Sequence, residues 1–139
     1  MTMERTLFII KPDAVRAGNQ YKILAEIEEN GFELLGLKKL QLTRPQAEGF
    51  YAVHTEKPFF GELVDFMTSG PVFVGALQKE GAVVAWRELM GPTDATKAPE
   101  NTIRGKYGAS IQNNAVHGSD SIENGKIEIR HFFNCIELP

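Results

Sequence analysis

The chain has 139 residues, 42% of them hydrophobic, and this size suits one compact domain over residues 1–139 with a buried core. Its 15 lysines and arginines and 18 aspartates and glutamates give a net charge of −3. This balance excludes the broad positive field that holds nucleic acid non-specifically, so a phosphate site would have to gather its cations locally.

Cysteine usage and hydropathy indicate the compartment. Cys135 is the single cysteine, so no internal disulfide can form. The first residues lack the long apolar stretch of a signal peptide, and no apolar run approaches the ~20 residues that span a bilayer. The sequence therefore predicts a cytoplasmic protein without a membrane span.

The first part of the chain predicts strands that alternate with helices. An apolar, β-rich run ends at Pro12, which cannot donate to a strand ladder, so Lys11 is expected at the end of the first strand. Apolar residues then recur at helical spacing until Gly31, which suits a helix end. The expected elements are a strand at 6–10, a helix at 21–30, a strand at 32–42 and a short helix from Pro45.

The second part predicts further helices around one long loop. Helical spacing indicates helices at 60–67 and 81–90, with a strand at 72–77 between them. The polar, glycine-rich stretch 92–118 predicts a functional loop, because loops of that length are uncommon in compact domains. The final segments predict a short helix at 120–126 and an alternating last strand at 127–136.

These elements favour an α+β fold of one domain. Two strand-helix-strand units with added helices fit a ferredoxin-like sandwich, in which helices cover one face of a mainly antiparallel four-stranded sheet. Such a fold does not define a function, so the chemistry must come from particular side chains.

The common glycine-rich phosphate loops are missing from the sequence. Residues 31–36 have the spacing of a Walker loop, but Leu37 occupies the lysine position, and no Gly-x-Gly-x-x-Gly run occurs. A nucleotide would therefore be held by side chains rather than by a backbone cradle. The candidates are Lys11, Arg87, Thr93, Arg104 and Asn114.

His117 is the candidate nucleophile. It lies among glycine and small polar residues, which leave an imidazole accessible. A histidine with a pKa near ~6.5 is largely neutral at pH 7 and can attack phosphorus through a free lone pair. Glu128, expected at the start of the last strand, is a candidate acceptor for the other ring nitrogen or for Ser119. His54 and His131 are expected to be structural.

Six segments carry a resemblance to one family, namely 9–15, 49–51, 57–60, 67–71, 102–105 and 114–120. They resemble the nucleoside diphosphate kinase family, and the match extends over nearly the whole chain. The resemblance implies a kinase that moves the γ-phosphate of a nucleoside triphosphate to a nucleoside diphosphate in a ping-pong reaction, through a phosphohistidine at His117 and with low base selectivity.

The same resemblance implies the roles of other residues. Ser119 and Glu128 would support the histidine, and Mg²⁺ would enter with the nucleotide, held mainly by phosphates and water. The base would lie among three apolar side chains, Phe59, Leu63 and Ile111, whose stacking suits every base. The phosphates and ribose would be surrounded by Lys11, Tyr51, Arg87, Thr93, Arg104 and Asn114.

The implied partners are nucleotides such as ATP, GTP and GDP, with no stable nucleic-acid partner and no membrane. A homo-oligomer is also implied, but Asp94-Ala95 departs from the commoner family pattern in a loop that helps assembly, so tetramer and hexamer both stay open. Lys106 and Asn113 depart from the pattern at positions without an assigned role. Two other functions stay open, a non-catalytic nucleic-acid or nucleotide-binding module and a phosphocarrier for other proteins.

Overall fold

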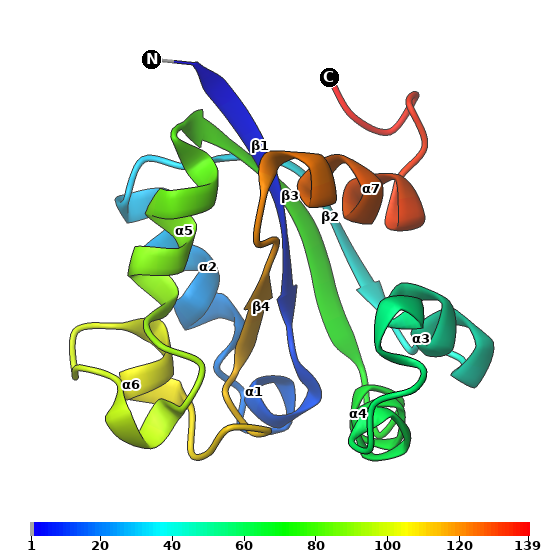
Figure 1. Cartoon of the computed structure of the whole chain (residues 1–139). Coiled ribbons are helices and arrows are strands. Elements are labelled where there is room, and N and C mark those ends of the chain that lie inside the picture. The colour runs from blue at the N-terminus through cyan, green and yellow to red at the C-terminus, as the bar shows by residue number, and fades with distance from the viewer. Residues whose placement is uncertain (1) are drawn as a thin grey trace.

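A four-stranded antiparallel sheet forms the centre of the computed structural model, which describes residues 2–139 (Figure 1). The strands are β1 (Met3–Ile10), β2 (Glu33–Leu40), β3 (Val72–Glu80) and β4 (Val116–Gly118), in the spatial order β2-β3-β1-β4. Every neighbouring pair is antiparallel. This order is that of the ferredoxin-like fold, so the predicted fold class is confirmed.

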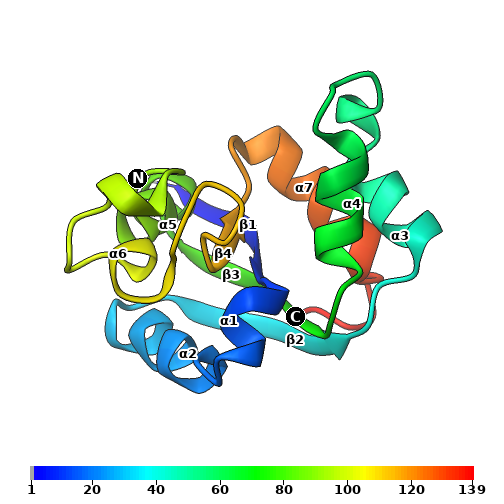
Figure 2. The ribbon, with the colours of Figure 1, turned by 90° about the horizontal axis from the view of Figure 1, so that it is seen from below.

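Helices lie on both sides of this sheet (Figure 2). The α-helices are α1 (Pro12–Arg16), α2 (Gln20–Glu29), α3 (Arg44–Phe50), α4 (Phe60–Met67), α5 (Ala82–Met90), α6 (Ile103–Tyr107) and α7 (Ile122–Phe132). Two 3-10 turns lie between helices: η1 (Ala52–His54) between α3 and α4, and η2 (Ala95–Lys97) between α5 and α6. No helix within residues 2–139 is both long enough and apolar enough to cross a membrane.

The alternation of side chains along β1 explains why both faces are covered. Phe8 and Ile10 pack in one core with α2 and α5, whereas Leu7 and Ile9 pack in a second core with α4 and α7. Successive side chains of a strand point to opposite faces, so an uninterrupted apolar run must be buried on both. The expectation that helices cover only one face is therefore wrong.

The carboxyl-terminal part of the chain also differs from the expected order. The segment 127–136, predicted as the last strand, lies largely in helix α7. Ser121 begins this helix, because its hydroxyl accepts a hydrogen bond from the Asn124 N–H at 3.0 Å. The strand was predicted from the alternation of Ile127 and Ile129, which would place both side chains on one buried face. In the structure Ile129 packs in the core, but Ile127 is 64% exposed. The period of this segment is helical.

The actual last strand, β4, lies inside the stretch predicted as a loop. It has three residues and pairs with β1, so that His117 is opposite Ile9. The helix predicted at 120–126 is longer than expected, because α7 continues to Phe132, and α1 and α6 were not expected. The remaining predicted elements are confirmed to within three residues at each end. Glu128 consequently lies on α7 rather than on a strand. β4 and α7 are adjacent in the chain, and together they position the candidate site.

Candidate active site

One cavity of about 850 Å³ opens beside β4, a size that suits a nucleotide. The elements around it are the end of β1, the end of α5, the loop after α5, the first turn of α6 and β4 itself. Six of the residues predicted from the sequence line it, namely Lys11, Arg87, Thr93, Arg104, Asn114 and His117. Residues far apart in the chain are thus brought to one place.

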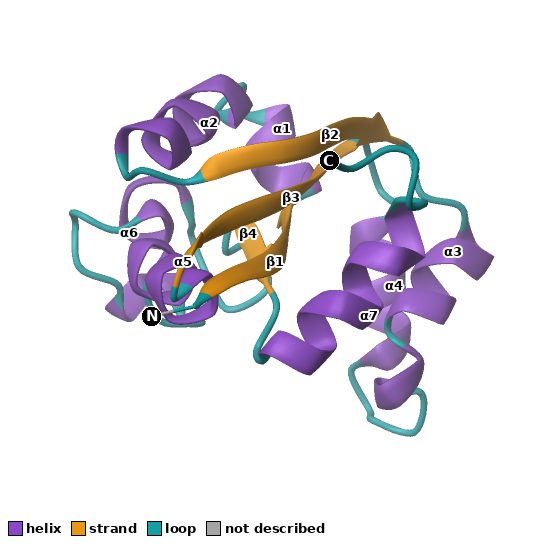
Figure 3. Ribbon diagram, turned by 90° about the horizontal axis from the view of Figure 1, so that it is seen from above, coloured by secondary structure: helices purple, strands orange, loops and turns teal. Residues whose placement is uncertain are grey.

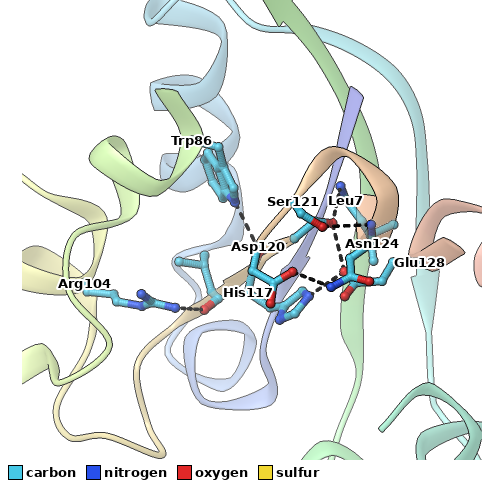
Figure 4. Close-up of polar contacts among 10 residues, drawn as sticks. Leu7, Trp86, Arg104, His117, Asp120, Ser121, Asn124 and Glu128 are labelled. Carbon is cyan, nitrogen blue, oxygen red and sulfur yellow. Dashed lines mark hydrogen bonds and ion pairs between the residues drawn. The ribbon is translucent and has the colours of Figure 1, made fainter. Parts of the chain in front are cut away.

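The imidazole of His117 is oriented by a carboxylate. Its Nε2 lies 2.9 Å from Oε1 of Glu128, and the Ser119 hydroxyl donates to the same oxygen at 2.9 Å (Figure 4). The Leu7 N–H in turn donates to the Ser119 oxygen at 3.2 Å. A carboxylate only accepts, so a neutral imidazole carries its proton on Nε2 and leaves the lone pair on Nδ1.

Two contacts hold the backbone of β4 from the opposite side. The indole Nε1 of Trp86 donates to the His117 carbonyl at 3.2 Å, and Arg104 Nη2 donates to the Val116 carbonyl at 2.9 Å (Figure 4). Gly118 allows the indole to come this close, because a Cβ there would lie 2.4 Å from Trp86 Cδ1. The strand that carries the imidazole is therefore fixed on both sides.

Lys11 is linked to the loop residues by hydrogen bonds. Its Nζ donates to Asn114 Oδ1 at 2.9 Å, and Asn114 Nδ2 donates to the Thr93 carbonyl at 3.1 Å. Burial, and next the charge of Arg104, lower the pKa of the Lys11 ammonium to about 8. An anion in the cavity would favour the charged form again.

Arg104 is a buried cation at the wall of the cavity. Nη1 donates to the Gly91 carbonyl at 2.9 Å, whereas the buried Nε has no partner among residues 2–139. Burial, and next the charge of Arg87, lower the pKa of Arg104 to about 10. Three cations that repel one another in a concave site are stabilised by an anionic ligand such as a phosphate.

Two aromatic residues of the α3 end lie behind the imidazole. The Phe50 ring meets the His117 ring edge-on, with 5.4 Å between centroids. Tyr51 is buried, and burial followed by the charge of Glu128 raises the pKa of its hydroxyl. That hydroxyl has no partner in the part of the chain that the structure describes. Tyr51 was expected at the site, whereas Phe50 and Trp86 were not, and the only signal for Phe50 was its place in a matching segment.

The three residues expected around the base do not line this cavity. Phe59 is 45% exposed before α4, Ile111 is 63% exposed in the loop, and Leu63 is half-buried on α4. The loop nevertheless approaches α4, because Gln112 shares a cavity of about 590 Å³ with Phe66. Stacking of a base between Phe59 and Ile111 stays a prediction.

The cavity combines an oriented imidazole with an ammonium and two guanidinium groups. This combination is typical of proteins that bind phosphate esters and transfer phosphoryl groups. The comparisons with known proteins narrow this class. The family model described as "Nucleoside diphosphate kinase" matches residues 4–138.

Relatives that match over nearly their full lengths bear the same name. The nucleoside diphosphate kinase of Geobacter sp. (strain M21) is 54% identical, and that of Campylobacter jejuni subsp. jejuni serotype O:23/36 (strain 81-176) is 56% identical; each match covers 98% of this chain and 99% of the relative.

Solved structures are also similar. The Aquifex aeolicus enzyme has a TM-score of 0.97 at 43% identity, covering 99% of this chain and 100% of that one. The Halobacterium salinarum enzyme in complex with CDP has a TM-score of 0.94 at 40% identity, covering 99% and 92%. The chain belongs to the nucleoside diphosphate kinase family. It is therefore a phosphotransferase of nucleotide metabolism, and nucleotides are its substrates.

Proposed function

We propose that this enzyme works by a ping-pong reaction through a phosphohistidine at His117. The Nδ1 lone pair attacks the γ-phosphorus of a nucleoside triphosphate, a P–N bond forms as the bond to the β-phosphate oxygen breaks, and the diphosphate leaves. A terminal oxygen of a second diphosphate then reverses these steps. The observation that carries the proposal is the 2.9 Å contact of Nε2 with Glu128 beside a cavity lined by cations.

The cations of the cavity have a common task in this reaction. The transferring phosphoryl group carries its charge on three oxygens, and fixed positive groups stabilise it in the transition state. Lys11, Arg87 and Arg104 supply this charge, and their location in the wall shared with His117 supports the assignment. In this proposal Asn114 meets the ribose or the phosphates, and its hydrogen bonds with Lys11 and the Thr93 carbonyl support this role.

Tyr51 and the apolar residues complete the proposed site. Burial keeps the Tyr51 hydroxyl protonated, so it is available as a donor on the Glu128 side of the imidazole. The base stacks on Phe59 with Leu63 and Ile111 beside it, and the exposure of the first and last of these supports that assignment. Stacking without base-edge hydrogen bonds gives low base selectivity.

Kinases of this family generally use a divalent metal, and we assign Mg²⁺ to this enzyme. The lining of the cavity combines the carboxylate of Glu88 with ammonium and guanidinium groups, which repel a bare cation. Mg²⁺ therefore fits this site as a complex with the nucleotide phosphates and water, rather than in a protein cage. The bound ion would supply positive charge that offsets part of the phosphate charge.

We also propose that the enzyme is a homo-oligomer of four or six subunits located in the cytoplasm. Strand β2 is an edge of the sheet and lies beside α2 (Figure 3). Leu34 and Leu37 of β2 are exposed, as is Tyr21 of α2. An edge strand with exposed apolar side chains favours pairing with another chain. These features support self-association through this edge.

Labelling with ATP tests the phosphohistidine. Incubation with γ-labelled ATP and Mg²⁺, but no acceptor, should give a phosphoprotein that is labile in acid and stable in base, and added GDP should remove the label as GTP. EDTA should lower the rate of labelling. His117→Ala should abolish both steps, whereas His131→Ala, a histidine on α7 outside the cavity, should retain both. Label on the His117→Ala protein would refute the mechanism.

A further inference from the structure

The residue two positions before His117 has a strained backbone. Ala115 has a φ of +72° and is the only non-glycine residue with a positive φ among residues 2–139. The Val116 N–H donates to the Asn114 carbonyl at 2.8 Å, which closes a three-residue turn around Ala115. Turns of this kind with positive φ at the centre are rare and strained, so contacts around the turn must maintain it.

This turn sets the positions of two groups of the proposed site. On one side of it, the Asn114 side chain meets Lys11, and on the other side β4 begins and carries His117. A relaxed turn would change the direction of the chain between them. Displacements of about 1 Å in a reacting group can reduce a rate as much as ~100-fold.

The segment at the start of α1 holds both polar groups of the Ala115 backbone. Its N–H donates to Asp13 Oδ2 at 3.1 Å, and its carbonyl accepts from the Lys11 N–H at 2.8 Å. The other Asp13 oxygen, Oδ1, is buried without a partner in the described part of the chain. Burial raises the pKa of this carboxyl, and the Ala115 N–H is the first of the contacts that oppose the rise. A buried carboxyl oxygen without a hydrogen-bond partner lowers the stability of the fold. The contact of Asp13 with the turn is therefore expected to have a function that offsets this loss.

We propose that Asp13 is a positioning residue that keeps the strained turn at Ala115 closed and thereby aligns His117 with the phosphate. Asp13 does not line the cavity and acts through the Ala115 backbone. The inference rests on the proposed role of His117. A purely structural reading is that Asp13 only stabilises the first turn of α1, where it also lies.

A double-mutant cycle between Asp13 and Ala115 separates the two readings. Asp13→Ala should lower kcat for phosphate exchange between ATP and GDP about tenfold, which is about 1.4 kcal/mol in transition-state free energy, with a smaller change in KM. Glycine adopts positive φ without a steric cost. In an Ala115→Gly background, the loss caused by Asp13→Ala should therefore shrink to about threefold or less.

Further variants keep the test decisive. Asp13→Asn retains a side-chain oxygen that can accept the Ala115 N–H and should recover most of kcat. If Asp13→Ala does not fold, Asp13→Asn and Asp13→Ser are compared in both backgrounds. Glu48→Ala removes a partly exposed carboxylate on α3 that does not line the cavity; it is the control and should keep wild-type turnover. Equal losses in the wild-type and Ala115→Gly backgrounds, or no loss at all, would overturn the proposal.

The labelling experiment is run on the same proteins to keep the two proposals distinguishable. If the wild-type enzyme forms no phosphohistidine but the cycle shows the predicted non-additivity, the mechanism through His117 fails while Asp13 still acts through the turn. If labelling occurs at the same rate in wild type and Asp13→Ala, the positioning role fails and the mechanism stands. ¹⁵N spectra of the His117 ring should change in Asp13→Ala and return towards wild type in the double variant.

Discussion

Glu128 and Ser119 form a short relay from the sheet to the imidazole. The backbone of β1 fixes Ser119, Ser119 donates to Glu128, and the same carboxylate oxygen meets His117. Each member restricts the next, so the orientation of the ring depends on the whole series. The residues of this relay were expected from the sequence, but Leu7, whose N–H starts it, contributes only its backbone and leaves no signal in a sequence pattern.

Removing the carboxylate should slow phosphate transfer without removing the proposed nucleophile, His117. Glu128→Ala should lower the single-turnover rate of phosphoenzyme formation by roughly 10- to 100-fold, because the ring loses its orientation and preferred tautomer. Ser119→Ala should have a smaller effect on this rate. It should instead lower the free energy of unfolding in urea by about 1–3 kcal/mol, since the Leu7 N–H loses its side-chain acceptor. Wild-type rates in Glu128→Ala would contradict the assigned contact.

The lowered pKa of Lys11 predicts an alkaline limb in the pH profile. Lys11 loses its charge as the pH rises through about 8, so kcat/KM of the wild-type enzyme should fall above that pH. The stability depends on pH in the opposite direction. Between about pH 8 and pH 10.5 the unfolded chain binds more protons at Lys11 than the folded chain does. The contribution of Lys11 to the free energy of unfolding therefore rises with pH in this window.

Lys11→Arg is the matched control for this profile, because a guanidinium stays charged over the whole range. Whatever its absolute rate, this variant should lack the decline near pH 8 in a stopped-flow or coupled exchange assay. If both proteins decline together, another group is responsible for the alkaline limb.

The helices and long strands were predictable because each bears a complete local signal. The helix at Phe60–Met67 has one apolar face and a glycine-proline break after it, and the structure reproduces its limits. Strand β1 was found from its apolar run, although the run also contained the information that both faces are covered. Strong periodicity together with clear end signals is sufficient for such elements.

The elements that carry His117 and Glu128 were the hardest to predict. β4 has three residues, and its stability comes from pairing with β1 and from Trp86 and Arg104 rather than from its own composition. A local stretch of sequence cannot reveal contacts between residues that are far apart in the chain. α7 was misassigned for a different reason, because alternation over a few residues also occurs on a partly exposed helix.

The arrangement of the whole chain explains why the site residues could be predicted better than their contacts. Matching segments spread from residue 9 to residue 120 contain many of the candidate side chains, and the fold brings four of these, Lys11, Arg104, Asn114 and His117, to one cavity. Asp13 was inside such a segment without a role, because its partner is the backbone of Ala115 rather than a side chain. The order of elements, by contrast, required the structure.

The exposed edge of the sheet predicts how assembly can be disrupted. Leu37→Lys places a charge on β2, where two copies would face each other, and should shift the protein towards smaller species in light scattering. Val53→Lys changes another exposed apolar residue, in η1, and should leave the mass unchanged. A wild-type protein that is monomeric, or a Leu37→Lys protein with wild-type mass, would contradict assembly through this edge.

The late position of β4 and α7 in the chain has a consequence for biosynthesis. The three long strands and α5 precede both elements, so a growing polypeptide can bury much of its apolar surface before His117 and Glu128 have been synthesised. By the proposed mechanism, a nascent chain on the ribosome takes phosphate from ATP at the full rate only after translation has passed Glu128. Premature termination anywhere before that codon leaves a protein without the oriented imidazole.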